Sequence, residues 1–87
     1  MRHYKIRPTK QYRKDYKRIL KSRYDIQKLE TIIDHLASGD VLPAHYRDHA
    51  LRGIMQGSRE CHIGPDWLLR YKKNEDHLIL PSSHQHR

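Results

Sequence analysis

The sequence of 87 residues lacks Phe, has a single Cys, and contains no apolar run of even ten residues. One cysteine, Cys61, excludes an internal disulfide framework and suits a reducing cytoplasm, which is where we expect the protein to be found. Without a long apolar run there is neither a signal-peptide core nor a transmembrane helix. Gly and Pro number only four each, so a disordered low-complexity chain is also disfavoured. We therefore expect one soluble domain over residues 1–87.

Positive charge is abundant and is concentrated at the start of the chain. Residues 1–24 contain ten Lys or Arg against one Asp, whereas residues 25–40 contain one Lys against four acidic residues. A basic segment of this kind favours a polyanionic partner, because each neutralised phosphate releases condensed counterions. A solvated helix face with no partner is the alternative. For the RNA interpretation, the candidate contacts in this segment are Lys10, Arg13, Lys14 and Lys17.

The first half of the sequence predicts a strand followed by two helices. "HYKIRP" alternates as a strand does, and Pro8 ends it because proline withholds a ladder donor. Thr9 and Asp25 are suited to cap the two helices, and Gly39 stands where a helix often terminates. The two apolar stripes are Tyr12, Tyr16, Ile19 and Leu20, then Ile26, Leu29, Ile32, Ile33 and Leu36.

The second half predicts short strands after the loop "DVLPAHYRDHA". The segments with strand propensity are Leu51–Met55, Arg59–Ile63, Trp67–Lys72 and His77–Leu80. We therefore expect an α+β fold of order β-α-α-β-β-β(-β), with a helical hairpin packed on one face of a small, mainly antiparallel sheet. The opposite face of the sheet is then available for function.

The segment "GSRECHIGPDWLLRYKK" places a histidine and a carboxylate at one end of a predicted hairpin. His62 and Asp66 flank the reversal at Gly64-Pro65. Imidazole and carboxylate are the groups that transfer protons near neutral pH. A basic surround would hold a phosphodiester and stabilise charge on its oxygens. The candidates for that surround are Arg47, Arg52, Arg59, Arg70 and Lys72.

Each of these residues also has a structural interpretation. Asp66 is a common turn former after Gly-Pro, and this role is compatible with a functional one. Trp67 is favoured as a core anchor over a base-stacking platform. Cys61 in mid-strand is favoured as a small buried hydrophobe.

Metal binding is disfavoured, and we expect neither a metal nor a cofactor. His45 and His49 have the spacing of ligands on a helix, and His84 and His86 are further donors. Position 46, however, is Tyr and not the Glu of a metalloprotease helix, and Pro43 makes a helix there doubtful.

The segment "LPAHYRDHALRGIMQGSRECHIGPDWLLRYKKNEDHLIL" resembles the YafQ-type branch of the RelE/ParE toxin superfamily. The agreement is close over residues 42–80, and the basic start "QYRKDYKR" and the second predicted helix also follow the family. The matching positions are Tyr46, Asp48, His49, Leu51, Gly53, Gly57, Arg59, His62, Pro65, Asp66, Trp67 and Tyr71.

The resemblance implies a RelE-like fold and the toxin of a type II toxin–antitoxin pair, a small RNase that cuts mRNA on the ribosome without a metal. The mRNA 2′-OH would attack the adjacent phosphate while an acid protonates the leaving 5′ oxygen. The family's functional positions fall on His49, His62, Asp66 and Trp67, and which group is base and which acid stays open. The implied partners are a cognate antitoxin, mRNA on the ribosome and 16S rRNA, the last through the basic helix. The implied assembly is a toxin–antitoxin heterotetramer or larger.

The tail at residues 81–87 departs from the family pattern. Counted without gaps, His86 falls on a family histidine, but Ser82 stands where the family has a phosphate-binding arginine. Pro81 is expected to weaken the last strand, because it removes a ladder donor. We hypothesise a slipped reading frame near codon 81, which the encoding DNA would test. The expected consequence is reduced or absent cleavage with binding largely kept.

Three other functions stay open. The chain could be an inactive protein of this fold that binds an antitoxin, a ParE-like gyrase inhibitor, or a plain RNA-binding protein. Acid–base residues at His49, His62 and Asp66 favour the RNase, because the gyrase-directed branch has no use for them there.

Overall fold

The computed structural model describes residues 3–53 and 56–85 and confirms the expected α+β fold. Two helices and a short 3-10 helix, η1, accompany five strands. In chain order the elements are β1 (Lys5–Pro8), α1 (Lys10–Leu20), α2 (Ile26–Ala37), η1 (Ala44–Tyr46), β2 (His49–Ala50), β3 (Arg59–Gly64), β4 (Trp67–Asn74) and β5 (His77–Gln85).

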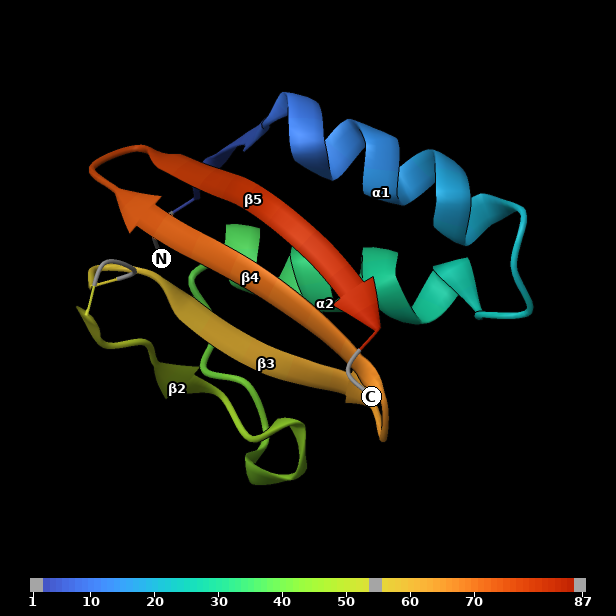
Figure 1. Cartoon of the computed structure of the whole chain (residues 1–87). Coiled ribbons are helices and arrows are strands. Elements are labelled where there is room, and N and C mark those ends of the chain that lie inside the picture. Colours follow the sequence, from blue (N-terminus) through green and yellow to red (C-terminus); the bar gives the residue numbers. More distant parts are fainter. Residues whose placement is uncertain (1–2, 54–55, 86–87) are drawn as a thin grey trace.

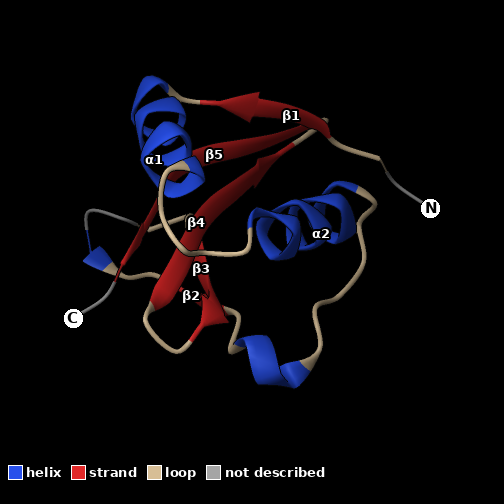
Figure 2. Ribbon diagram, turned by 90° about the vertical axis from the view of Figure 1, so that its right-hand side faces the viewer, coloured by secondary structure: helices blue, strands red, loops and turns tan. Residues whose placement is uncertain are grey.

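The five strands form one sheet in the order β1-β5-β4-β3-β2. Only the β1–β5 pair is parallel; the other three pairs are antiparallel. Helices α1 and α2 lie on the same side of the sheet (Figures 1 and 2). The opposite side, which we call the open face, is not covered by either helix.

The predicted caps are confirmed. The Thr9 side chain accepts a hydrogen bond from the Tyr12 N–H, and the Asp25 side chain accepts one from the Gln27 N–H. Gly39 has φ +80°, the left-handed conformation that glycine adopts without steric cost. Leu20 was expected in the buried stripe of α1, but it is 53% exposed because the helix ends there.

The core lies between the helices and the inward face of the sheet. From β3 and β4 the inward side chains are Cys61, Ile63, Trp67, Leu69 and Tyr71, all part of one buried cluster with the helix stripes. Since successive side chains in a strand alternate between faces, His62, Leu68 and Arg70 belong to the open face.

The predicted strand Leu51–Met55 is wrong. The strand in this region is β2, only two residues long, and it precedes that segment. Gly53 has φ +70°, which is incompatible with an extended strand, and residues 54–55 lie outside the described residues. The apolar pattern in this segment is short, and strand propensity alone was not enough to predict its structure.

The last strand was predicted over His77–Leu80, but β5 continues through Pro81 to Gln85. Its register against β4 shifts between Lys72↔Ile79 and Arg70↔Ser82, so that Leu80 and Pro81 together face Tyr71. This is a β-bulge, one of the few places in a sheet where a proline fits without the loss of a ladder hydrogen bond.

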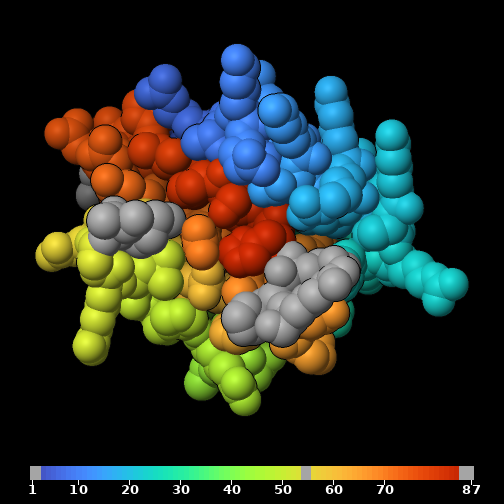
Figure 3. Space-filling model, viewed as in Figure 1, coloured from blue at the N-terminus to red at the C-terminus, as the bar shows by residue number. Residues whose placement is uncertain are grey.

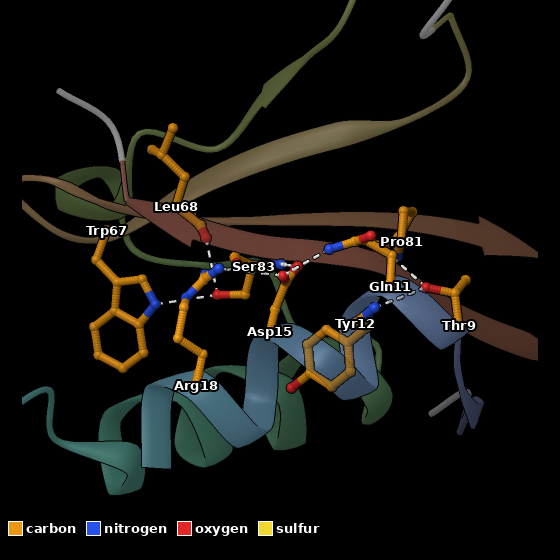
Figure 4. A network of polar contacts seen from close by, with 9 residues as sticks. All are labelled: Thr9, Gln11, Tyr12, Asp15, Arg18, Trp67, Leu68, Pro81 and Ser83. Carbon is orange, nitrogen blue, oxygen red and sulfur yellow. Dashed lines mark hydrogen bonds and ion pairs between the residues drawn. The ribbon is translucent and has the colours of Figure 1, made fainter. Parts of the chain in front are cut away.

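β1 ends at Pro8 and pairs with β5 only as far as Leu80. Beyond the bulge, side chains of α1 provide the hydrogen-bond partners along this edge of β5. Asp15, 3% exposed, accepts the Ser83 N–H at 3.1 Å, and Arg18 donates to the Ser83 carbonyl at 3.3 Å. The Ser83 hydroxyl donates to the Leu68 carbonyl at 3.0 Å and accepts the Trp67 indole N–H at 3.1 Å. Figure 4 shows these contacts, which we call the Ser83 clamp. The clamp therefore satisfies both the backbone and the side chain of Ser83, which is fully buried.

Candidate active site

Two cross-strand rows of side chains occupy the open face. The first, the Glu60 row, runs His49, Glu60, Arg70, Ser82 across β2, β3, β4 and β5. The second, the Leu68 row, runs His62, Leu68, His84 across β3, β4 and β5. Directly paired residues point to the same face, so the sheet itself brings these seven positions together.

Glu60 is the centre of the first row. Its side chain is largely buried, with the residue 9% exposed. One carboxylate oxygen lies 3.6 Å from His49 Nε2, and the other accepts from Arg70 Nε at 3.1 Å. A buried carboxylate with two such partners holds both side chains in place on the face.

No role was predicted for Glu60, although the sequence indicated that it shares a face with His62. Glu60 and His62 are two residues apart in a predicted strand and therefore share a face.

His49 and His62, two of the candidate proton-transfer groups, are neighbours in the structure. Their ring centroids are 6.0 Å apart. His49 Nδ1 lies 2.7 Å from the Arg47 carbonyl, and Arg47 itself has φ +50°. The backbone turn before β2 therefore orients the His49 ring. His62 is half-buried, and His49 is exposed.

A basic pocket of about 450 Å³ adjoins His62 at the free edge of β3. It contains two cationic side chains, Lys28 and Arg47, and the rings of His45 and Tyr46, which lie 4.1 Å apart. Its lining contains no carboxylate: Lys28, His45, Tyr46, Arg47, His62, Ile63, Gly64 and Pro65. The pocket extends the candidate site beyond the two rows and favours an anion.

Asp66 and Trp67 are placed differently from His62. Asp66 is exposed in the turn, and its carboxylate accepts from the Tyr24 hydroxyl at 3.1 Å. Trp67 is 2% exposed and packs against Tyr24, with ring centroids 4.6 Å apart. The core-anchor interpretation of Trp67 is therefore confirmed, and the base-stacking expectation has no exposed ring face to support it.

The expected RNA-binding cations divide between the two faces. Arg70 lies on the open face, as does the exposed Lys72, and Arg52 is exposed in the loop after β2. Arg59 instead pairs with Asp48 at 2.9 Å and lies opposite Tyr71 on the helix side.

Arg59, Asp48 and Tyr71 form a structural cluster. The hydrogen bond to Asp48 raises the pKa of Arg59, and burial followed by the Asp48 hydrogen bond raises that of Tyr71. We therefore assign Arg59 to this cluster and not to the open face.

The basic residues of α1 are exposed, including Lys10, Arg13, Lys14 and Lys17. Figure 3 looks onto the molecule in the view of Figure 1 and shows α1 (blue) beside β5 (red). The basic helix thus lies along the rim of this side of the molecule.

His45 and His49 have the spacing of zinc ligands on a helix, but they do not lie on one helix. His45 lies in η1, which ends at Tyr46, and His49 lies in β2. Within residues 3–53 and 56–85, no cluster of three or more His, Cys, Asp or Glu could hold a metal. His86 lies outside the described residues.

Cys61 is fully buried, and burial raises the pKa of its thiol to about 12, as expected of a core residue. Among the described residues, no helix is long and apolar enough to cross a membrane.

A family model described as "Bacterial toxin of type II toxin-antitoxin system, YafQ" matches residues 4–87. The chain belongs to the YafQ toxin family. It is 38% identical over 77 residues to the mRNA interferase toxin YafQ of Escherichia coli K12, covering 87% of this chain and 84% of that protein.

Solved toxin structures have the same fold. A copper-bound mutant toxin from Helicobacter pylori has a TM-score of 0.91 at 35% identity, covering 95% of this chain and 94% of that one. YafQ in the Escherichia coli DinJ–YafQ toxin–antitoxin complex has a TM-score of 0.87 at 34% identity, covering 95% and 92%. The expected RelE-like architecture is confirmed.

Proposed function

We propose that this chain is a ribosome-dependent mRNA endoribonuclease that works by acid–base chemistry without a metal. The observation that supports this most directly is the pair His49 and His62, 6.0 Å apart on a sheet face that also holds Glu60 and Arg70. Two imidazoles beside a fixed guanidinium are suited to move protons around a phosphodiester and to stabilise its charge.

In the proposed reaction the mRNA 2′-oxygen forms a bond to phosphorus and the bond from phosphorus to the 5′-oxygen breaks. A base takes the 2′-OH proton and an acid gives a proton to the 5′-oxygen. His49 and His62 act at the reacting atoms, and Glu60 positions His49 and Arg70. Asp66, at the end of the hairpin, is a further group for proton transfer. Trp67 has a positioning role, because it packs in the core against Tyr24 and donates a hydrogen bond to Ser83. Arg47, Arg52, Arg70 and Lys72 contact the RNA backbone.

The proposed partners are a cognate antitoxin and the ribosome. The Escherichia coli relative was crystallised with the antitoxin DinJ, which supports a corresponding partner here. The exposed Lys and Arg of α1 provide the surface for 16S rRNA. An assembly of two toxins with two antitoxins, or a larger one, is part of the proposal.

Cleavage by this chain is proposed to be slower than in its relatives. Ser82 lies in the Glu60 row beside Arg70, at the position where the resemblance places an arginine. A serine hydroxyl cannot neutralise a phosphate oxygen, and loss of one such contact costs about a hundredfold or more in rate.

The test is cleavage of a defined mRNA on programmed ribosomes by the purified 87-residue chain, in the presence of EDTA. Wild type should give products with a 2′,3′-cyclic phosphate and a 5′-OH. His49→Ala and His62→Ala should each lower the single-turnover rate by about 10²–10⁴. His35→Ala is the matched control, because His35 is exposed on α2 and pairs with Asp40 in the helix layer.

Absence of any wild-type cleavage, with antitoxin binding intact, would favour an inactive binding protein. Inhibition of gyrase by wild type and by His62→Ala alike would favour the ParE-like alternative.

A further inference from the structure

We propose that His84 is a catalytic residue of this chain, the general acid that protonates the leaving 5′-oxygen opposite His62. The inference rests on the proposed endoribonuclease function and adds a residue to it.

The Leu68 row places the two histidines on either side of one apolar residue. His62 pairs with Leu68, and Leu68 pairs with His84, so all three side chains share the open face. Two strand spacings separate the histidine backbones by about 10 Å. Both histidines are half-buried, so each is held by its surroundings while part of it stays accessible.

The Ser83 clamp sets the direction of His84. Ser83 is fully buried and is held on the helix side by Asp15, Arg18, Trp67 and the Leu68 carbonyl. Because side chains alternate along a strand, a Ser83 that is fixed inward places Ser82 and His84 outward. In Figure 4 the Leu68 side chain lies on the side of the sheet away from α1. His84 pairs with Leu68 across the strands and therefore shares that side.

The separation suits an in-line displacement. The attacking 2′-oxygen and the leaving 5′-oxygen stand on opposite sides of phosphorus, so base and acid must approach from opposite directions. Leu68 is 3% exposed, so it forms the floor between the two histidines, and a phosphodiester bound between the two imidazole rings would have one histidine on each side. Arg70 is a diagonal neighbour of both, paired with Glu60 and Ser82 in the adjacent row, and can hold a non-bridging oxygen.

Electrostatics assign the acid to the β5 side. His62 stands 6.0 Å from His49, whose Nε2 lies 3.6 Å from a Glu60 carboxylate oxygen, so this side of the face has a carboxylate to stabilise the cation that forms when a base accepts the 2′-OH proton. On β5, the open-face residues between the bulge and Gln85 are Ser82 and His84, neither of them acidic. The 2′-OH proton therefore goes to His62, and the 5′-oxygen takes its proton from His84.

The decisive experiment compares two ribosome-bound mRNAs, one natural and one with sulfur in place of the scissile 5′-oxygen. His84→Ala should slow cleavage of the natural mRNA by about 10²–10⁴. On the sulfur mRNA the same variant should return to within about tenfold of wild type, because a thiolate leaves without a proton. His62→Ala should stay slow on both substrates.

His77→Ala is the control within the same strand, since His77 lies at the opposite end of β5. Thermal unfolding reports whether each variant is folded, and His84→Gln replaces His84→Ala if the alanine variant is unstable.

Normal cleavage of the natural mRNA by folded His84→Ala would overturn the proposal, and so would slow cleavage of both mRNAs. If wild type cleaves neither substrate, the endoribonuclease function fails and the role of His84 fails with it. If wild type cleaves and His84→Ala is unaffected, only the His84 inference fails.

Discussion

Ser82 is the residue whose identity we expect to affect the proposed cleavage most. It lies directly opposite Arg70, and the Arg70 guanidinium is held by Glu60. The open face therefore has one anchored guanidinium, Arg70, and lacks the arginine that the resemblance implies at position 82. The proposed site otherwise contains His49, His62 and Glu60 on the same face.

Ser82→Arg is expected to raise the single-turnover cleavage rate on programmed ribosomes by about tenfold to a hundredfold, because it adds a second cation for the phosphate oxygens. Ser82→Lys should give a smaller gain, since an ammonium cannot bind two oxygens with a planar fork. The matched control is Ser58→Arg, in the loop before β3. An unchanged rate for Ser82→Arg would mean that Ser82 does not limit activity.

At the scale of elements, the long β5 strand depends on α1. Beyond Pro8 the strand has no neighbour from β1, and an unpaired strand edge would leave backbone groups unsatisfied. Asp15 and Arg18 supply these partners from the helix, while the Thr9 hydroxyl lies 3.0 and 2.9 Å from the Leu80 and Pro81 carbonyl oxygens. The strand that carries Ser82 and His84 is thus positioned by side chains far away in the sequence.

Asp15→Ala should lower the free energy of unfolding by about 1–3 kcal/mol, because the buried Ser83 N–H loses its acceptor. The control is Asp34→Ala, the same substitution on the exposed side of α2, expected within about 0.5 kcal/mol of wild type. Urea denaturation measures both. Amide exchange should speed up at Ser83 in Asp15→Ala. Equal stability of the two variants would show that the clamp contributes little.

At the scale of the whole molecule, the core contains ionisable groups that are neutral when folded. Burial raises the pKa of Cys61 to about 12 from 9.0, and burial also raises the pKa of Tyr12 and Tyr71 above 10.0. Because the unfolded chain releases these protons at lower pH than the folded one, stability is full below about pH 9 and falls as pH rises above it.

The free energy of unfolding is therefore expected to decrease by on the order of 2 kcal/mol between pH 8 and pH 10.5 from Cys61 alone. Urea titrations at the two pH values measure it. Cys61→Ala should be less stable at pH 8 but should lose less on going to pH 10.5. A wild-type midpoint that does not move over this range would contradict the buried, neutral thiol.

Much of the architecture was predictable because it depends on local chemistry. Thr9, Asp25 and Gly39 mark helix ends through backbone geometry and short-range hydrogen bonds, so residue type and spacing suffice to find them. The hairpin at Gly64-Pro65 followed from turn chemistry. The predicted pair was His62 with Asp66, but the structure places His62 beside His49 and Asp66 against Tyr24. The placement of Arg59 was missed, although the two-residue period of a strand puts Arg59 on the same face as Cys61, which was expected to be buried.

The fold class, the helix caps, the basic first helix and the candidate proton-transfer residues could all be inferred from local chemistry. The extent of β5 and the pairs of residues that face one another across the sheet are known only from the folded structure. The bulge at Pro81 and the burial of Asp15 depend on the packing of α1 on β5. Glu60, Arg70 and His84 share one face of the sheet because of the strand register. Pairing between distant segments is set by packing of the whole core, and no local pattern encodes it.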